Sequence, residues 1–82
     1  MGGFLSIDIG FKYIKILELK ESAPGRLKLV RFGIGDTPKE SMSNGMVKKI
    51  DDVREEIEKI IKKFRLKGDR AKVVVSGTNI LS

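Results

Sequence analysis

The chain has 82 residues, with 17 basic and 11 acidic side chains, a formal net charge of +6, and neither cysteine nor histidine. This composition excludes disulfides and thiolate metal sites, and it excludes catalysis by a histidine base or by zinc bound to histidine. The length corresponds to one small domain with a marginal core. Because the apolar runs are short and no signal peptide precedes them, we expect a cytoplasmic protein without a membrane-spanning segment.

The excess of lysine and arginine is spread along the whole chain. A basic face can indicate nucleic-acid binding, because it attracts phosphate backbones. The four phenylalanines and one tyrosine are scattered, however, so the sequence offers no aromatic run for base stacking. We therefore interpret the charge as a solvated surface and do not expect a nucleic-acid partner.

Three strands are predicted in the first half of the chain. Residues 4–9 and 13–20 are β-branched apolar runs separated by a short turn that begins at Gly10. A second turn is expected at residues 23–26, where proline and glycine occupy the central positions of a type II turn. Residues 27–34 then return as a third strand, so the second and third strands should form a hairpin.

The stretch from Gly35 to Lys49 is rich in turn residues and is predicted to be a loop. An amphipathic helix should follow over residues 51–66, with Asp51 or Asp52 as its cap and Gly68 as its stop. Its apolar residues recur at helical spacing and form one stripe. The stripe consists of Val53, Ile57, Ile60, Ile61 and Phe64.

A last strand is predicted over residues 71–76, ending at Ser76-Gly77. The order β-β-β-α-β, with the last strand parallel to the first in a mixed sheet, indicates an α/β fold of the ribonuclease H-like class, which includes the actin-like ATPases. Both faces of this sheet carry apolar residues, but one predicted helix can cover only one of them. We therefore expect a partial domain that self-associates through its bare face.

The segment around the first turn combines three groups that a phosphate and magnesium site requires. Asp8 supplies a carboxylate at the end of the first strand, Gly10 opens a turn with backbone N–H groups, and Lys15 supplies an ammonium group. Carboxylate oxygens suit Mg²⁺, and amide nests and cations bind phosphate. A structural interpretation is also open, in which Asp8 bonds turn amides, Gly10 serves only the turn, and Lys15 is an ordinary surface lysine.

The ordered series of motifs resembles the PilM family of actin-like proteins in type IV pilus assembly. The resemblance covers nearly the whole chain and is carried by Ile7-Asp8-Ile9-Gly10 with Lys15, Leu17-Glu18-Leu19, Phe32-Gly33 with Pro38, Asn44-Gly45-Met46-Val47, and Val73-Val74-Val75-Ser76-Gly77. It implies that residues 1–82 are the N-terminal half of an actin-like subdomain 1A. It also implies a nucleotide-binding scaffold that uses ATP and Mg, with at most weak ATPase activity in the full protein and none in this chain alone.

The resemblance assigns roles to individual residues but implies no catalytic residue in this chain. Asp8 would hold magnesium through water, and Lys15 would approach the phosphates. Backbone amides would come from the turn formed by Gly10, Phe11, Lys12 and Tyr13.

The partners implied by the resemblance are the short N-terminal cytoplasmic tail of PilN, docked between subdomains 1A and 1C, and other inner-membrane pilus proteins. The protein would then be cytoplasmic and peripheral at the inner membrane. Two alternatives remain open at this point. One is a small ribonuclease H-like nucleic-acid protein, which would need further carboxylates near Asp8, and the other is a stand-alone interaction module.

Overall fold

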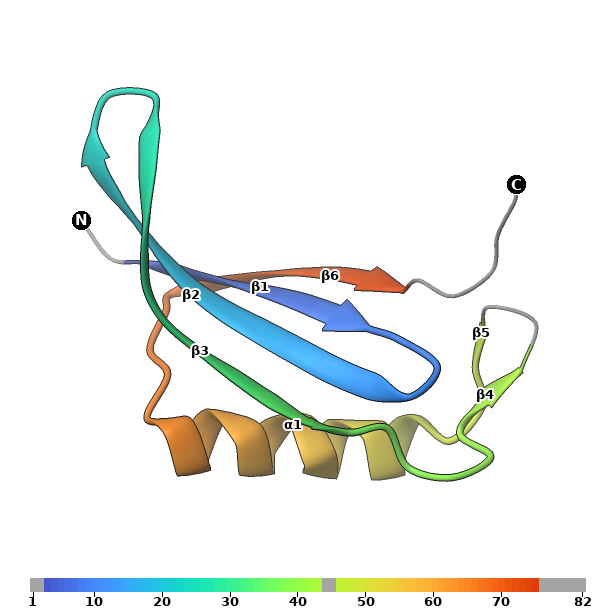
Figure 1. Cartoon of the computed structure of the whole chain (residues 1–82). Coiled ribbons are helices and arrows are strands. Elements are labelled where there is room, and N and C mark those ends of the chain that lie inside the picture. The colour runs from blue at the N-terminus through green and yellow to red at the C-terminus, as the bar shows by residue number, and fades with distance from the viewer. Residues whose placement is uncertain (1–2, 44–45, 76–82) are drawn as a thin grey trace.

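The computed structural model describes residues 3–43 and 46–75, and a four-stranded mixed sheet forms the centre of the described part. Its strands are β1 (Phe4–Ile9), β2 (Tyr13–Ala23), β3 (Arg26–Asp36) and β6 (Arg70–Val75). They lie in the order β3-β2-β1-β6 (Figure 1), with β6 parallel to β1 and the other pairs antiparallel. The predicted fold class and the parallel pairing of the last strand are confirmed.

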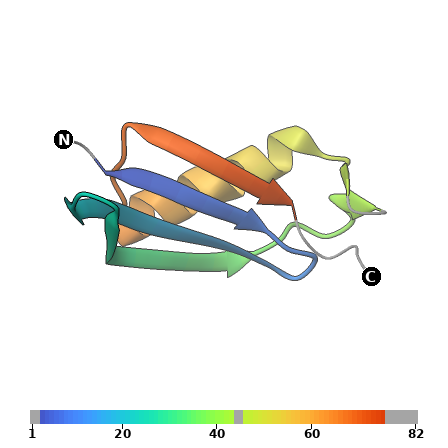
Figure 2. The ribbon, with the colours of Figure 1, turned by 90° about the horizontal axis from the view of Figure 1, so that it is seen from above.

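The helix α1 (Ile50–Phe64) packs on one face of the sheet, mainly against β3 and β2 (Figures 1 and 2). Alternate residues of β1 and β2 point toward it, and Ile14 and Ile16 are completely buried. The predicted helix stripe is confirmed, because Val53 and Ile60 are buried and its other members pack against the core. The buried apolar core consists of Leu5, Ile7, Ile9, Ile14, Ile16, Val53, Ile60 and Leu66.

Two glycines of β3 lie beneath the helix and let it approach the strand closely. A Cβ atom on Gly33 would lie 2.6 Å from Cδ2 of Phe64, and one on Gly35 would lie 2.8 Å from Cδ1 of Ile60. Real Cβ atoms do not come so near to their neighbours, so any larger residue would push α1 away from the sheet. The backbone of β3 therefore forms part of the packing surface itself.

The β2–β3 hairpin is longer than predicted. β2 continues past residue 20 to Ala23, and β3 begins at Arg26. Gly25 between them has a φ of 75°, which agrees with the third position of the predicted type II turn.

The helix ends differ from the prediction. The N-cap residue is Lys49, without a side-chain cap, whereas Asp51 and Asp52 lie in the first turn, where carboxylates favour the helix dipole. The helix stops at Arg65, which adopts a left-handed conformation with φ 56° and ψ 43°. Gly68 is not the stop, because it lies beyond this cap against the backbone of β1.

The predicted loop over residues 35–49 contains more structure than expected. β3 extends to Asp36, and the short strands β4 (Met42–Ser43) and β5 (Met46–Val47) form an antiparallel pair. Two-residue strands leave too short a pattern for alternation to reveal them. Residues 44–45 and the predicted strand end at residues 76–77 lie outside the described residues.

The face of the sheet opposite α1 carries exposed apolar side chains. Phe32 and Ile34 of β3 and Val74 of β6 are 59%, 43% and 45% exposed. Their partners in the neighbouring strands are Leu17, Lys15 and Asp8, so all of these lie on the same face. We call this surface the open face.

The glycine contact generates a first prediction. Gly33→Ala should lower the free energy of unfolding by about 1–3 kcal/mol, because the added methyl group overpacks the contact with α1. Chemical denaturation measures the change, and Ile34→Val, on the open face of the same strand, is the matched control. The double variant Gly33→Ala with Phe64→Ala should lose less stability than the sum of the two single losses, because the smaller side chain leaves room for the methyl group. Purely additive losses would contradict the proposed clash.

Candidate functional site

Asp8 and Lys15 are direct partners across the β1–β2 ladder. Side chains on directly opposed residues of an antiparallel pair have Cβ atoms about 5 Å apart. Both residues lie on the open face, because the neighbouring Ile7, Ile9 and Ile14 point into the core beneath α1. The structure thus brings together the carboxylate and the ammonium group that the sequence analysis selected.

The turn between β1 and β2 follows directly after this pair. The N–H of Gly10 donates to the carbonyl oxygen of Tyr13 at 2.9 Å, which closes the turn. Within residues 3–43 and 46–75, the only non-glycine residues with positive φ are Glu40 and Arg65. Phe11 and Lys12 therefore occupy the turn without left-handed strain, and Phe11 is 62% exposed.

Thr37, just after the end of β3, forms two hydrogen bonds with this turn. Its hydroxyl donates to the carbonyl oxygen of Gly10 at 2.7 Å, and its N–H donates to the carbonyl oxygen of Lys12 at 2.9 Å. Thr37 is buried, with 9% of its surface exposed. Thr37 was not predicted as a site residue, because the sequence pattern indicates a loop at this position. A hydroxyl residue followed by Pro38, one position after a strand, was the available signal.

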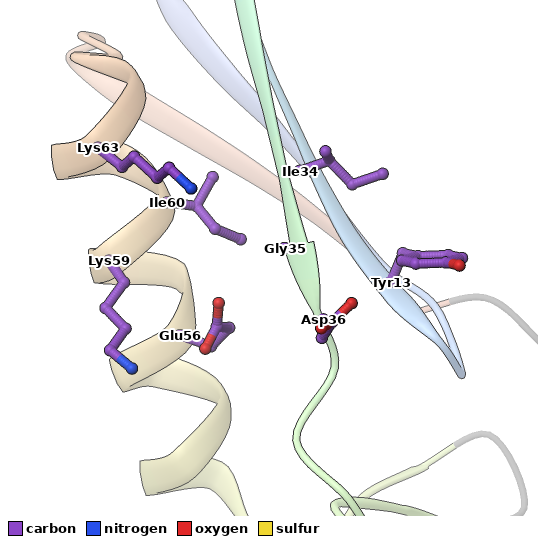
Figure 3. Close-up of a pocket in the computed structure, with 8 residues that line it drawn as sticks. All are labelled: Tyr13, Ile34, Gly35, Asp36, Glu56, Lys59, Ile60 and Lys63. Carbon is purple, nitrogen blue, oxygen red and sulfur yellow. The ribbon is translucent and has the colours of Figure 1, made fainter.

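Two hollows flank the turn. One, of about 540 Å³, is lined by Phe11, Lys12, Tyr13, Asp36, Thr37, Pro38, Lys39 and Glu40. The other, of about 400 Å³, lies between β3 and α1 and is lined by Tyr13, Ile34, Gly35, Asp36, Glu56, Lys59, Ile60 and Lys63 (Figure 3). Figure 3 shows Glu56, Lys59 and Lys63 along the helix, with Asp36 on the strand opposite them. Both hollows are lined by Tyr13 of the candidate phosphate turn, but the first is also lined by Phe11 and Lys12.

The carboxylates of the described residues do not form a metal-binding cluster. No group of three or more acidic side chains in this part of the chain could hold a metal ion. The glutamates of α1 lie on the covered side of the sheet, whereas Asp8 lies on the open face. A carboxylate such as Asp8 suits Mg²⁺ that is bound mainly by phosphates and water.

Among the described residues, no helix is long and apolar enough to cross a membrane.

The family model described as type IV pilus assembly protein PilM matches residues 6–82. A comparison with curated proteins gives no match. Among solved structures, the type II variant of the Ppx/GppA phosphatase of Aquifex aeolicus matches with a TM-score of 0.52 and 21% identity, over 89% of this chain and 26% of the phosphatase. A crystal structure of the Aquifex aeolicus member of the Ppx/GppA family matches with a TM-score of 0.49 and 22% identity, over 87% of this chain and 24% of that one.

These structural matches concern the fold alone. The match with the TM-score of 0.52 agrees with the predicted actin-like class of α/β folds. The chain spans about a quarter of the length of the solved structures that it matches.

The geometry of the turn predicts that Phe11 is dispensable for folding. Phe11→Ser should change the free energy of unfolding by less than about 0.5 kcal/mol, because the side chain is exposed and the backbone is unstrained. Thermal or chemical unfolding measures the change. Ile14→Ala, three residues along in the core, should by contrast cost about 2–5 kcal/mol. A loss at Phe11 as large as that at Ile14 would show that the aromatic ring holds the turn.

Proposed function

The chain belongs to the family of type IV pilus assembly protein PilM, and on this premise we propose that it is the N-terminal half of a nucleotide-binding actin-like subdomain, 1A. In this proposal residues 1–82 form a partial domain that carries the first phosphate-binding turn of a pilus assembly scaffold. The observation that carries the proposal is the Asp8–Lys15 pair beside a turn whose carbonyl groups are held by Thr37. This pair and turn lie at the end of two parallel neighbours, β1 and β6, an edge where α/β folds bind ligands.

The proposed ligand is ATP with Mg²⁺. A bound Mg²⁺ would neutralise part of the negative charge of the phosphates. Asp8 would hold the hydrated ion, and Lys15 would approach the phosphates as a point charge. Phe11, Lys12 and Tyr13 would present backbone amides, whereas the N–H of Gly10 already donates to the carbonyl of Tyr13 inside the turn. The side chain of Lys12 would add a second positive charge.

The proposed partners follow from the family. We propose that a PilN-like cytoplasmic tail and other inner-membrane pilus proteins bind the full protein and keep it, in the cytoplasm, at the inner membrane. In this proposal the chain supplies only part of that surface.

We also propose that the open face drives self-association of this chain. Phe32 and Ile34 of β3 lie two residues apart, and Phe32 is paired with the half-buried Leu17 of the neighbouring strand β2, so these apolar side chains are adjacent on the open face. Extended apolar surfaces of this kind favour contacts between molecules.

The proposal predicts weak nucleotide binding by this chain and no hydrolysis of ATP. A micromolar complex needs about 8 kcal/mol, whereas each exposed charged contact contributes about 1 kcal/mol or less. Titration of the labelled chain with Mg-ATP at millimolar concentration should shift the resonances of Asp8 and the turn. Lys15→Ala should reduce these shifts, and Lys20→Ala, at the far end of the same strand, is the charge-matched control. Micromolar binding that Asp8→Ala abolishes would contradict the claim that this chain holds only part of the site. Shifts confined to other elements would contradict the location of the site at the β1–β2 turn.

The open face predicts concentration-dependent association. Sedimentation velocity should detect species larger than the monomer, and Phe32→Lys should shift the population toward the monomer by placing a charge on the open face. Ile50→Lys is the matched control, because Ile50 is also exposed but lies at the start of α1. A strict monomer at high concentration, or an equal effect of both variants, would contradict the proposal.

A further inference from the structure

We infer that Thr37 is a positioning residue of the phosphate turn: it fixes the direction in which the turn presents its backbone N–H groups. The inference rests on the proposed function and extends it to a residue just after the end of β3, 27 positions from Gly10. Thr37 does not itself contact the proposed ligand. It acts through the two carbonyl groups that it binds.

The peptide bond is planar, so its carbonyl and N–H groups have fixed relative directions. The carbonyl of Gly10 and the N–H of Phe11 belong to the same trans peptide and therefore point in opposite directions. When the hydroxyl of Thr37 holds the Gly10 carbonyl at 2.7 Å, it also directs the Phe11 N–H away from Thr37. The N–H of Thr37 likewise holds the carbonyl of Lys12, so the N–H of Tyr13, which belongs to the same peptide, also points away from Thr37.

The same two bonds control electrostatics at the turn. A carbonyl oxygen that faced the ligand would repel phosphate, because both carry negative charge. Thr37 binds the carbonyl oxygens at both ends of the Phe11–Lys12 segment and keeps them on its own side. The N–H groups of Phe11 and Tyr13 are thereby turned away from Thr37.

Thr37 can fix the turn because its own position is fixed. Asp36, which precedes it, is paired with Tyr13 in the sheet, and Pro38, which follows it, restricts the backbone. The carbonyl of Pro38 accepts bonds from the N–H and the hydroxyl of the fully buried Ser41, at 3.2 and 2.6 Å. The carbonyl of Ser41 in turn accepts a bond from the N–H of Lys48, at 2.6 Å, just before α1.

The test compares three variants of the full chain by NMR. Thr37→Val keeps the shape and the N–H bond but removes the hydroxyl, Thr37→Ser keeps the hydroxyl, and Thr37→Ala is a second variant without it. One measurement is amide hydrogen exchange at Gly10 and Thr37, whose N–H groups are hydrogen-bonded within the turn. The other is titration with inorganic triphosphate and magnesium, followed at the amides of Phe11 and Lys12.

Loss of the hydroxyl should speed exchange in the turn about threefold to tenfold, as expected for one hydrogen bond. Triphosphate binding should weaken by a similar factor in Thr37→Val, and Thr37→Ser should restore both. Exchange in β1 and β6 should stay unchanged, which separates positioning from a general loss of stability. If Thr37→Val also speeds exchange in β1 and β6, triphosphate binding is compared between Thr37→Ala and Thr37→Ser instead, and tighter binding by Thr37→Ser is expected.

Equal binding by the wild type and a folded variant without the hydroxyl would overturn the inference. If the wild type shows no response to triphosphate at the turn, the proposed function fails. The exchange measurement then still decides whether Thr37 holds the turn: unchanged exchange in the variants without the hydroxyl would overturn this as well.

Discussion

The close contact between α1 and the bare backbone of β3 at Gly33 and Gly35 determines how the rest of the chain is arranged. Because no side chain separates them, the helix lies near enough for Ile60 and Phe64 to reach the strand itself. Its apolar stripe then covers the core residues of β2 and β1, which leaves the other face of the sheet bare. One sheet thus has a packed side, which provides stability, and an open side, on which Asp8 and Lys15 lie.

The same contact places the residue that holds the phosphate turn. β3 runs beside β2 up to the pair Tyr13 and Asp36, so the segment that connects β3 to α1 starts next to the β1–β2 turn. Thr37 is the first residue of this segment, and both of its polar groups reach the turn. A residue distant in sequence therefore completes the candidate site, because the helix requires the chain to leave the sheet at this edge.

Much of the fold follows from local patterns in the sequence. The apolar runs of β1 and β6, the Pro24-Gly25 turn and the helical stripe from Val53 to Phe64 each depend on spacing that a single sequence displays. The helix ends were wrong because capping depends on backbone conformation, and Arg65 adopts a left-handed conformation in which glycine is more usual. The β4–β5 pair was missed because two residues are too few to show alternation.

The candidate site was predictable in part. Asp8, Gly10 and Lys15 are near one another in sequence, so a hairpin necessarily brings them together. Thr37 was not predictable in this way, since its contact with Gly10 depends on the register of β3 against β2. The open face followed from the apolar alternation of β3 once a single helix was available to cover the sheet.

The central claim is that the end of the β1–β2 hairpin receives the phosphates of a metal-bound nucleotide. Replacing magnesium by paramagnetic manganese tests it most directly, because Mn-ATP broadens the resonances of nearby protons in the labelled chain. The account predicts broadening at Asp8, Gly10, Phe11 and Lys12, with little effect at the Pro24-Gly25 turn at the other end of the sheet. Broadening centred on the acidic start of α1 at Asp51 and Asp52, with the hairpin end unaffected, would contradict it.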